Sequence, residues 1–123
     1  MKIKGMNRNN LLKIRNQINL ILELIEEFKD IKDLSNEDII RSVYLEIGNI
    51  NEVLEAINAY GLKIKSEARN RYRVYNANDI SEILISDKES SLGKVSNNFF
   101  NYNKKRCSWT SLYKICKEIR SIK

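Results

Sequence analysis

The fold is decided by residues 46–84, which read EIGNINEVLEAINAYGLKIKSEARNRYRVYNANDISEIL. Gly48 is followed at once by Asn49, and a glycine often ends one helix in the left-handed conformation while an asparagine caps the next. Gly61 follows the second helical stretch in the same way. Two helices joined by so tight a turn have the spacing of a helix-turn-helix. From Leu62 onward apolar and charged residues alternate, which is the period of a β-strand.

Helical periodicity extends on both sides of this stretch. It predicts a helix over about Asn9–Lys29, a helix capped by Ser35 that runs up to Gly48, a helix capped by Asn76 or Asn78, a short helix over Val95–Tyr102 and a last helix capped by Ser108. We therefore expect one domain over residues 1–123. Its parts are an N-terminal helix (1–34), a core (35–85), a polar linker with the short helix (86–107, the linker being 86–94) and a C-terminal helix (108–123).

A β-hairpin is predicted over residues 62–75, with residues 66–70 as its loop. We expect one apolar face, with Leu62, Ile64, Tyr72 and Val74, to lie on the helices. The opposite face is expected to carry Lys63, Lys65, Arg71 and Arg73, with Arg69 at the tip. Such a charged face suits a phosphate backbone, and charge on an exposed edge strand also protects against aggregation.

In the order of its elements, the segment Glu46–Leu84 with the helix before it resembles small winged helix-turn-helix DNA-binding proteins. The resemblance covers about 50 residues, and winged helices also serve as protein-binding modules. It implies a mainly α fold with a small β-hairpin wing and with extra helices at both ends.

The charge is clustered along the chain, whose net charge is +6. Residues 1–19 carry +5, residues 61–75 carry +4 and residues 94–123 carry +7, whereas residues 20–60 carry −7 and residues 76–93 carry −3. Basic clusters favour a polyanionic partner because each phosphate that is neutralised releases counterions. The alternative is that the charge serves solubility alone.

Catalytic and metal-binding functions lack the residues they need. The chain has no histidine and only two cysteines, Cys107 and Cys116, which cannot complete a four-ligand zinc site and are expected to be free thiols. There is no glycine-rich phosphate loop and no nucleophile elbow. We expect a protein that is not an enzyme and needs no cofactor. No apolar run spans a bilayer and no signal peptide precedes residue 10, so we expect a cytoplasmic protein without a membrane partner.

The sequence predicts a binder of duplex DNA led by the hairpin, such as a plasmid or phage accessory factor or a transcriptional regulator. The helix after Gly48 exposes Asn51, Glu52, Glu55 and Asn58, and its carboxylates would be repelled by phosphates. The predicted nucleic-acid contacts are Lys63, Lys65, Arg69, Asn70, Arg71, Arg73, Asn51, Lys104, Lys105 and Arg106.

Two other binding functions stay open at this point. The acidic helix surface could bind a protein, as in an inhibitor or subunit of a nucleoprotein complex, for example a phage-encoded anti-defence protein. RNA binding is the other alternative, although no RNP-type motif or GXXG loop supports it. The apolar stripe of the first helix is long enough for a homodimer interface; it comprises Leu11, Ile14, Ile18, Ile21, Leu22, Ile25 and Phe28. Trp109 is expected to belong to the core rather than to a stacking surface.

Overall fold

The computed structural model describes residues 5–66 and 71–122 of the chain. This part is mainly helical and has one two-stranded antiparallel hairpin, which confirms the coarse fold prediction. Its elements are α1 (Arg8–Lys29), α2 (Asn36–Ile47), α3 (Ile50–Tyr60), β1 (Lys63–Ser66), β2 (Arg71–Val74), α4 (Ala77–Ser86), α5 (Ser91–Asn103) and α6 (Trp109–Ile122). No described helix is long and apolar enough to cross a membrane.

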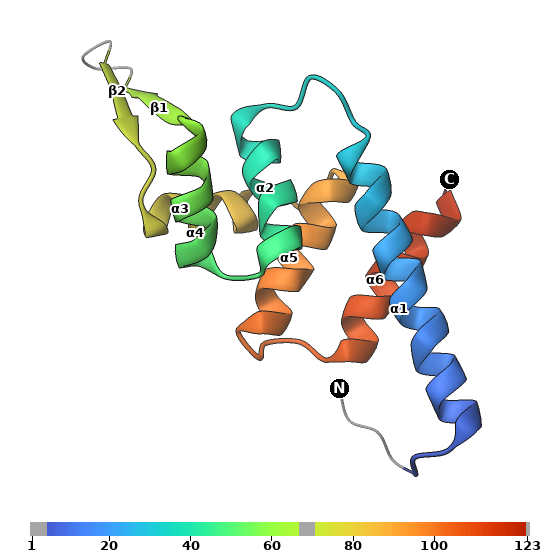
Figure 1. The fold of residues 1–123 in the computed structure, drawn as a ribbon. Helices are drawn as coiled ribbons and strands as arrows, with labels where there is room; N and C mark the ends of the chain where they lie inside the picture. The colour runs from blue at the N-terminus through green and yellow to red at the C-terminus, as the bar shows by residue number, and fades with distance from the viewer. Residues whose placement is uncertain (1–4, 67–70, 123) are drawn as a thin grey trace.

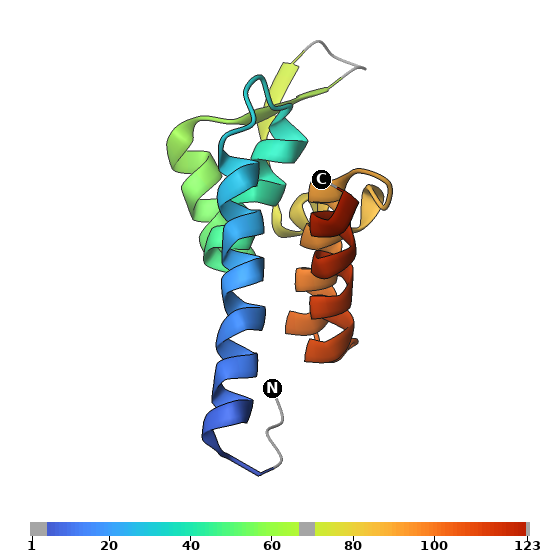
Figure 2. The same cartoon turned by 90° about the vertical axis from the view of Figure 1, so that its right-hand side faces the viewer.

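The helices pack as two layers (Figures 1 and 2). α2 lies against α5 in the middle, α1 packs on α6 at one end, and α3 packs on α4 at the other. The hairpin projects from the end of the molecule formed by α3 and α4, far from α6 (Figure 1). This layout places α3 and the hairpin on one side and the N- and C-terminal helices on the other.

Two groups of buried side chains hold the layers together. One joins α1, α5 and α6 and includes Leu24, Phe28 and Cys116; the other joins α2, α3 and α4 around Tyr44 and Ile80. α2 and α5 contribute to both groups, and each fully buried aliphatic side chain contributes about 1.5–3 kcal/mol. The two groups are therefore connected through the middle pair of helices.

The helix ends predicted at Ser35, Gly48, Asn49 and Gly61 are confirmed, and of the two candidate caps of α4 it is Asn76 that caps the helix. The side chains of Ser35, Asn49 and Asn76 accept hydrogen bonds from backbone N–H groups of α2, α3 and α4, respectively. Gly48 has φ 74° and Gly61 has φ 95°, so both occupy the left-handed region in which a side chain is strained. Turn chemistry that is local in sequence thus sets the α2–α3 connection.

The linker predicted over residues 86–94 is wrong from Ser91 onward. α5 begins there and runs for 13 residues, with Leu92, Val95 and Phe100 buried. Two small residues, Gly93 and Ser96, are buried as well, and their lack of apolar bulk made the start of the helix look like a polar linker. α5 is instead the central helix of its layer.

The face assignment of the hairpin is also wrong. Lys63 pairs with Val74 and Lys65 with Tyr72, whereas Ile64 pairs with Arg73 and Ser66 with Arg71. Directly paired residues lie on the same face of an antiparallel ladder. The two lysine positions therefore share a face with Val74 and Tyr72, and the two arginines occupy the opposite face.

The apolar residues of β2 do not cover the helices. Tyr72 is 66% exposed and Val74 is 58% exposed, while Leu62, just before β1, and Ile64 of β1 pack beside the α2–α4 group. Tyr75, just after β2, enters the core in their place and is 4% exposed. The register, which the alternation in each strand leaves open, decides this difference.

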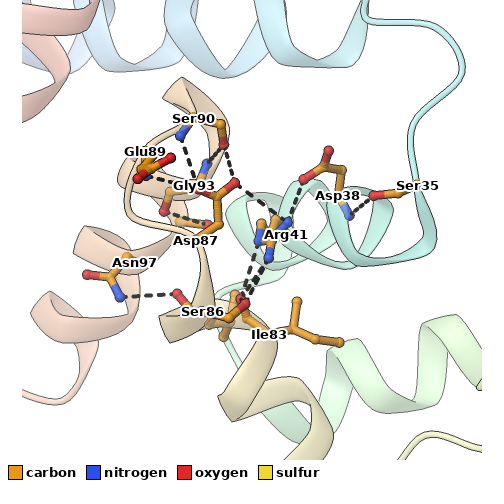
Figure 3. A network of polar contacts seen from close by, with 12 residues as sticks. Ser35, Asp38, Arg41, Ile83, Ser86, Asp87, Glu89, Ser90, Gly93 and Asn97 are labelled. Atoms are coloured by element: carbon orange, nitrogen blue, oxygen red, sulfur yellow. Dashed lines mark hydrogen bonds and ion pairs between the residues drawn. The ribbon is translucent and has the colours of Figure 1, made fainter.

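A buried arginine ties α2 to α4 and α5 (Figure 3). The guanidinium of Arg41 donates to the Ile83 carbonyl from two nitrogens, at 3.3 and 3.2 Å, and to Asp38 at 2.6 Å. It also lies 4.0 Å from Asp87, whose carboxylate accepts hydrogen bonds from the backbone N–H and hydroxyl of Ser90 at the start of α5. The Arg41 side chain therefore contacts both the end of α4 and the segment that leads into α5.

Candidate nucleic-acid interface

Three basic residues of the hairpin are exposed in the described part of the chain, namely Lys63, Arg71 and Arg73. Lys63 and Arg71 are exposed, and within residues 5–66 and 71–122 neither has an ion-pair partner. Lys63 lines a cavity of about 640 Å³ whose wall also includes Glu37 and Glu82, so its field is partly offset. Arg69 and Asn70 lie outside the described residues, as does the side chain of Lys65.

Arg73 has an intramolecular partner. Its two terminal nitrogens donate to the two carboxylate oxygens of Asp79 at 2.7 and 2.9 Å, a bidentate pair. Asp79 also accepts from the backbone N–H of Asn76. The Arg73 guanidinium holds the pKa of Asp79 below its usual value, and the hydrogen bond to Asp79 raises the pKa of Arg73. Arg73 therefore fastens the base of the hairpin to α4, and its charge is already balanced.

α3 presents an acidic and amidic surface. Asn51, Glu52, Glu55 and Asn58 are all exposed, as the sequence predicted. Among the described residues, neither glutamate forms an ion pair. α3 therefore presents negative charge along its exposed face, and positive charge must come from its neighbours if it faces a phosphate backbone.

One such neighbour is the basic turn, Lys104–Arg106, between α5 and α6. Its three side chains are exposed and have no acidic partner in the described part of the chain. Asn103, which precedes it, donates from Nδ2 to the Tyr44 hydroxyl at 3.0 Å and to the Gly48 carbonyl at 3.3 Å. The basic turn is thereby fastened to the α2–α3 turn, beside the N-terminus of α3.

The backbone of the basic turn is unusual at one position. Lys105 has φ 59°, its N–H donates to the Tyr102 carbonyl at 3.0 Å, and the Arg106 N–H donates to the Asn101 carbonyl at 2.8 Å. This pair of bonds is the Schellman motif, in which glycine is the usual residue at the left-handed position. A lysine there is strained, and strained non-glycine residues are concentrated at functional sites.

A cavity of about 830 Å³ opens beside the basic turn. Its wall includes Tyr102, Lys105, Cys107, Trp109 and Thr110. The rings of Tyr102 and Trp109 meet edge to face with centroids 6.3 Å apart, and Trp109 Nε1 donates to Gln17 Oε1 at 2.8 Å. Both rings are half-buried, so Trp109 belongs partly to the core, as predicted, and partly to this cavity.

The sequence predicted Lys104–Arg106 as nucleic-acid contacts but did not indicate which helix they lie beside. The residue that anchors them, Asn103, carries only a weak sequence signal. Asn103 is one of many asparagines, and nothing in its surroundings marked it as the anchor of the turn. Asn51 lies in the first turn of α3, next to the anchored α2–α3 turn. The structure thus brings Asn51 and the basic turn close together and places the hairpin at the opposite end of α3.

The apolar stripe of α1 is divided. Ile21 and Phe28 are buried within the chain, together with Leu24, which the stripe did not include. Leu11, Ile18 and Leu22 are exposed by 51%, 36% and 54%. Self-association through these three residues stays a prediction.

The pKa values of two groups outside the basic turn, Asp87 and Cys116, are shifted by their surroundings. Hydrogen bonds from Ser90 and Glu89 lower the pKa of Asp87 to about 2. Cys107 and Cys116 are free thiols, and burial raises the pKa of Cys116 to about 11. No group of three or more potential metal ligands occurs in the described part of the chain.

The chain matches no protein-family model, no curated protein and no solved structure.

Proposed function

We propose that the protein binds duplex DNA through basic groups at the two ends of α3, in the manner of a winged helix-turn-helix. One group is the hairpin, with Lys63, Arg71 and the predicted contact Arg69. The other is the basic turn, Lys104–Arg106. A role as an accessory factor of replication or as a transcriptional regulator would suit such a protein.

The anchoring of the basic turn by Asn103 is the observation that carries the proposal. Because Asn103 donates to Gly48 and Tyr44, the three cations are held beside the start of α3. α3 has 11 residues and is therefore about 16 Å long, similar to the roughly 12 Å width of a major groove. Cations at both ends of α3 are thus spaced to meet the phosphate rows on both sides of a groove.

This arrangement gives α3 a secondary role. Its exposed glutamates would oppose phosphate contacts, whereas Asn51 can form a bidentate pair with adenine. We therefore expect most of the affinity to be electrostatic and to depend strongly on salt. Arg73 is excluded from the contact set because Asp79 holds it.

A salt-titrated binding assay on random duplex DNA tests the proposal. The double variants Lys63→Ala/Arg71→Ala and Lys104→Ala/Lys105→Ala each remove two cations, one pair at each end of α3. Each is expected to reduce the slope of log affinity against log salt by about 1.8, because each phosphate that is no longer neutralised lowers the slope by about 0.9.

The matched control is Lys114→Ala/Lys117→Ala. It removes two exposed cations from α6, a helix that packs on α1 and α5 rather than on α3. Wild-type affinity and slope are expected for this variant. Equal reductions in all three double variants would refute the proposal, because they would reflect net charge alone.

A second candidate function is protein binding through the exposed face of α3. It is favoured by the exposure of Glu52 and Glu55 without ion pairs among the described residues. The partner that docks on this face of α3 would present a basic protein surface. Glu52→Gln/Glu55→Gln would abolish such a complex, whereas it would strengthen DNA binding by removing like charge.

A further inference from the structure

We infer that the cavity lined by Tyr102 and Trp109 holds the base of an unpaired nucleotide, whose phosphates contact the basic turn. The inference rests on the proposed role of Lys104–Arg106 in phosphate binding. It adds a distinct ligand, a single-stranded nucleotide, which the α3 surface alone would not recognise. The protein would accordingly prefer duplex DNA that has a single-stranded extension over blunt duplex.

The size and lining of the cavity fit this ligand. Its volume of about 830 Å³ lies within the range of about 300–1,000 Å³ that is typical of small-molecule sites. Two aromatic side chains, Tyr102 and Trp109, belong to the wall, and base–aromatic stacking tolerates any base because each base has a π-face. Ser108 and Thr110 add hydroxyl groups that can donate to base edges or phosphates.

The aromatic pair is held in place before any ligand binds. The hydrogen bond from Trp109 Nε1 to Gln17 fixes the indole from the α1 side, and the edge contact with Tyr102 fixes it from the α5 side. A stacking surface that is already ordered loses less side-chain entropy on binding.

The charge beside the cavity matches a nucleotide. Lys105 belongs both to the cavity wall and to the basic turn, and Lys104 and Arg106 are its immediate neighbours. A base inside the cavity would therefore have its phosphates within reach of exposed cations. Aromatic rings next to a basic strip form the usual combination in single-strand binding proteins.

The chain provides two direct reporters of this site. Trp109 is its single tryptophan, so intrinsic tryptophan fluorescence reads the cavity alone. Cys107 lines the same cavity and is half-buried, whereas the other thiol, Cys116, is fully buried. Maleimide labelling of Cys107 in the folded protein is therefore a second reporter.

The experiment titrates the full chain with a ten-nucleotide oligo(dT), with oligo(U) of the same length and with blunt duplex. Oligo(dT) is expected to quench Trp109 fluorescence and to slow labelling of Cys107 at least about fivefold, because a bound base covers both. Blunt duplex is expected to bind without either effect. Equal quenching by oligo(U) supports a site that recognises the base and the phosphate and not the sugar. A difference between the two oligomers shows whether the site prefers single-stranded DNA or RNA.

Thr110→Glu tests the location of the site. Thr110 is exposed in the first turn of α6, where a carboxylate suits the helix dipole, so the variant should fold. It is expected to weaken oligo(dT) binding about tenfold by repelling phosphate at the cavity. Ser121→Glu, with the same charge change at the other end of α6, is expected to bind like the wild type.

Failure of this inference can be distinguished from failure of the proposed function. Oligo(dT) that leaves Trp109 fluorescence and Cys107 labelling unchanged would overturn the inference, whether or not duplex binds. Equal oligo(dT) affinity in Thr110→Glu and Ser121→Glu would overturn it as well. Loss of salt-dependent duplex binding with quenching retained would refute only the duplex proposal.

Discussion

Replacing Lys105 by glycine should stabilise the protein and weaken its DNA binding at the same time. Lys105 occupies the left-handed position of the turn that ends α5, with φ 59°. A residue with a Cβ atom costs about 1–2 kcal/mol in this conformation. The greater chain entropy of glycine in the unfolded state cancels about 0.5–1 kcal/mol of the relief. The free energy of unfolding of Lys105→Gly should therefore rise by about 0.5–1 kcal/mol.

Urea denaturation measures the first effect. With an m-value of about 2 kcal/mol per molar, the unfolding midpoint of Lys105→Gly should increase by about 0.4 M. The salt titration on duplex DNA measures the second effect. Because one phosphate is no longer neutralised, the slope of log affinity against log salt should fall by about 0.9.

Lys105→Ala is the matched control, because it removes the same charge and keeps a Cβ atom in the strained conformation. It should show the same reduction in slope without the gain in stability. The reasoning is refuted if Lys105→Gly binds DNA like the wild type, since the strained lysine would then serve no phosphate contact. It is equally refuted if Lys105→Gly unfolds at lower urea than Lys105→Ala.

Three further predictions concern the packing of the helices. Arg41→Met should lower the free energy of unfolding by about 1–3 kcal/mol in urea melts, because the Ile83 carbonyl and the half-buried Asp38 carboxylate lose their hydrogen bonds from the guanidinium, and a decrease below about 0.5 kcal/mol would contradict the role given to the network. The lowered pKa of Asp87, about 2, means that its stabilisation is complete above its unfolded value of 3.8 and is lost as the pH falls toward 2. Acid melts of Asp87→Asn should therefore depend less on pH over that range than those of the wild type, and parallel curves would refute this. Gly93→Ala should destabilise by about 1–3 kcal/mol in urea, because its Cβ would lie 2.5 Å from Asp87 Cγ, and a wild-type midpoint would show that the contact relaxes freely.

The helix ends and the two glycine turns could be predicted from the sequence because they depend on neighbouring residues. Ser35, Asn49 and Asn76 cap their helices through bonds to backbone groups three positions away, and Gly48 and Gly61 end helices by their own conformational freedom. Such signals need no information about distant parts of the chain. The order of helices and the existence of the hairpin follow from the same local rules.

The start of α5 was not predicted, although Ser90 caps it by accepting from the Gly93 N–H, because Gly93 and Ser96 interrupt the apolar helical pattern of the residues after this cap. Gly93 and Ser96 have little intrinsic preference for a helix, and they become part of one because close packing requires small side chains there. A Cβ on Gly93 would collide with Asp87, which accepts from Ser90. Asp87 also lies 4.0 Å from Arg41, whose hydrogen bonds join residues more than 40 positions apart.

The candidate interface, too, could be predicted only in part. The positions of charged residues in the sequence determined that the chain is basic at both ends and at the hairpin, and that its third helix is acidic. Only the tertiary structure decided where these cations lie and which of them are paired. The strand register puts Lys63 and Arg71 on opposite faces of the hairpin, and Asp79 neutralises Arg73. Asn103 brings the basic turn to α3, because one amide meets a carbonyl 55 positions away that no local pattern could indicate.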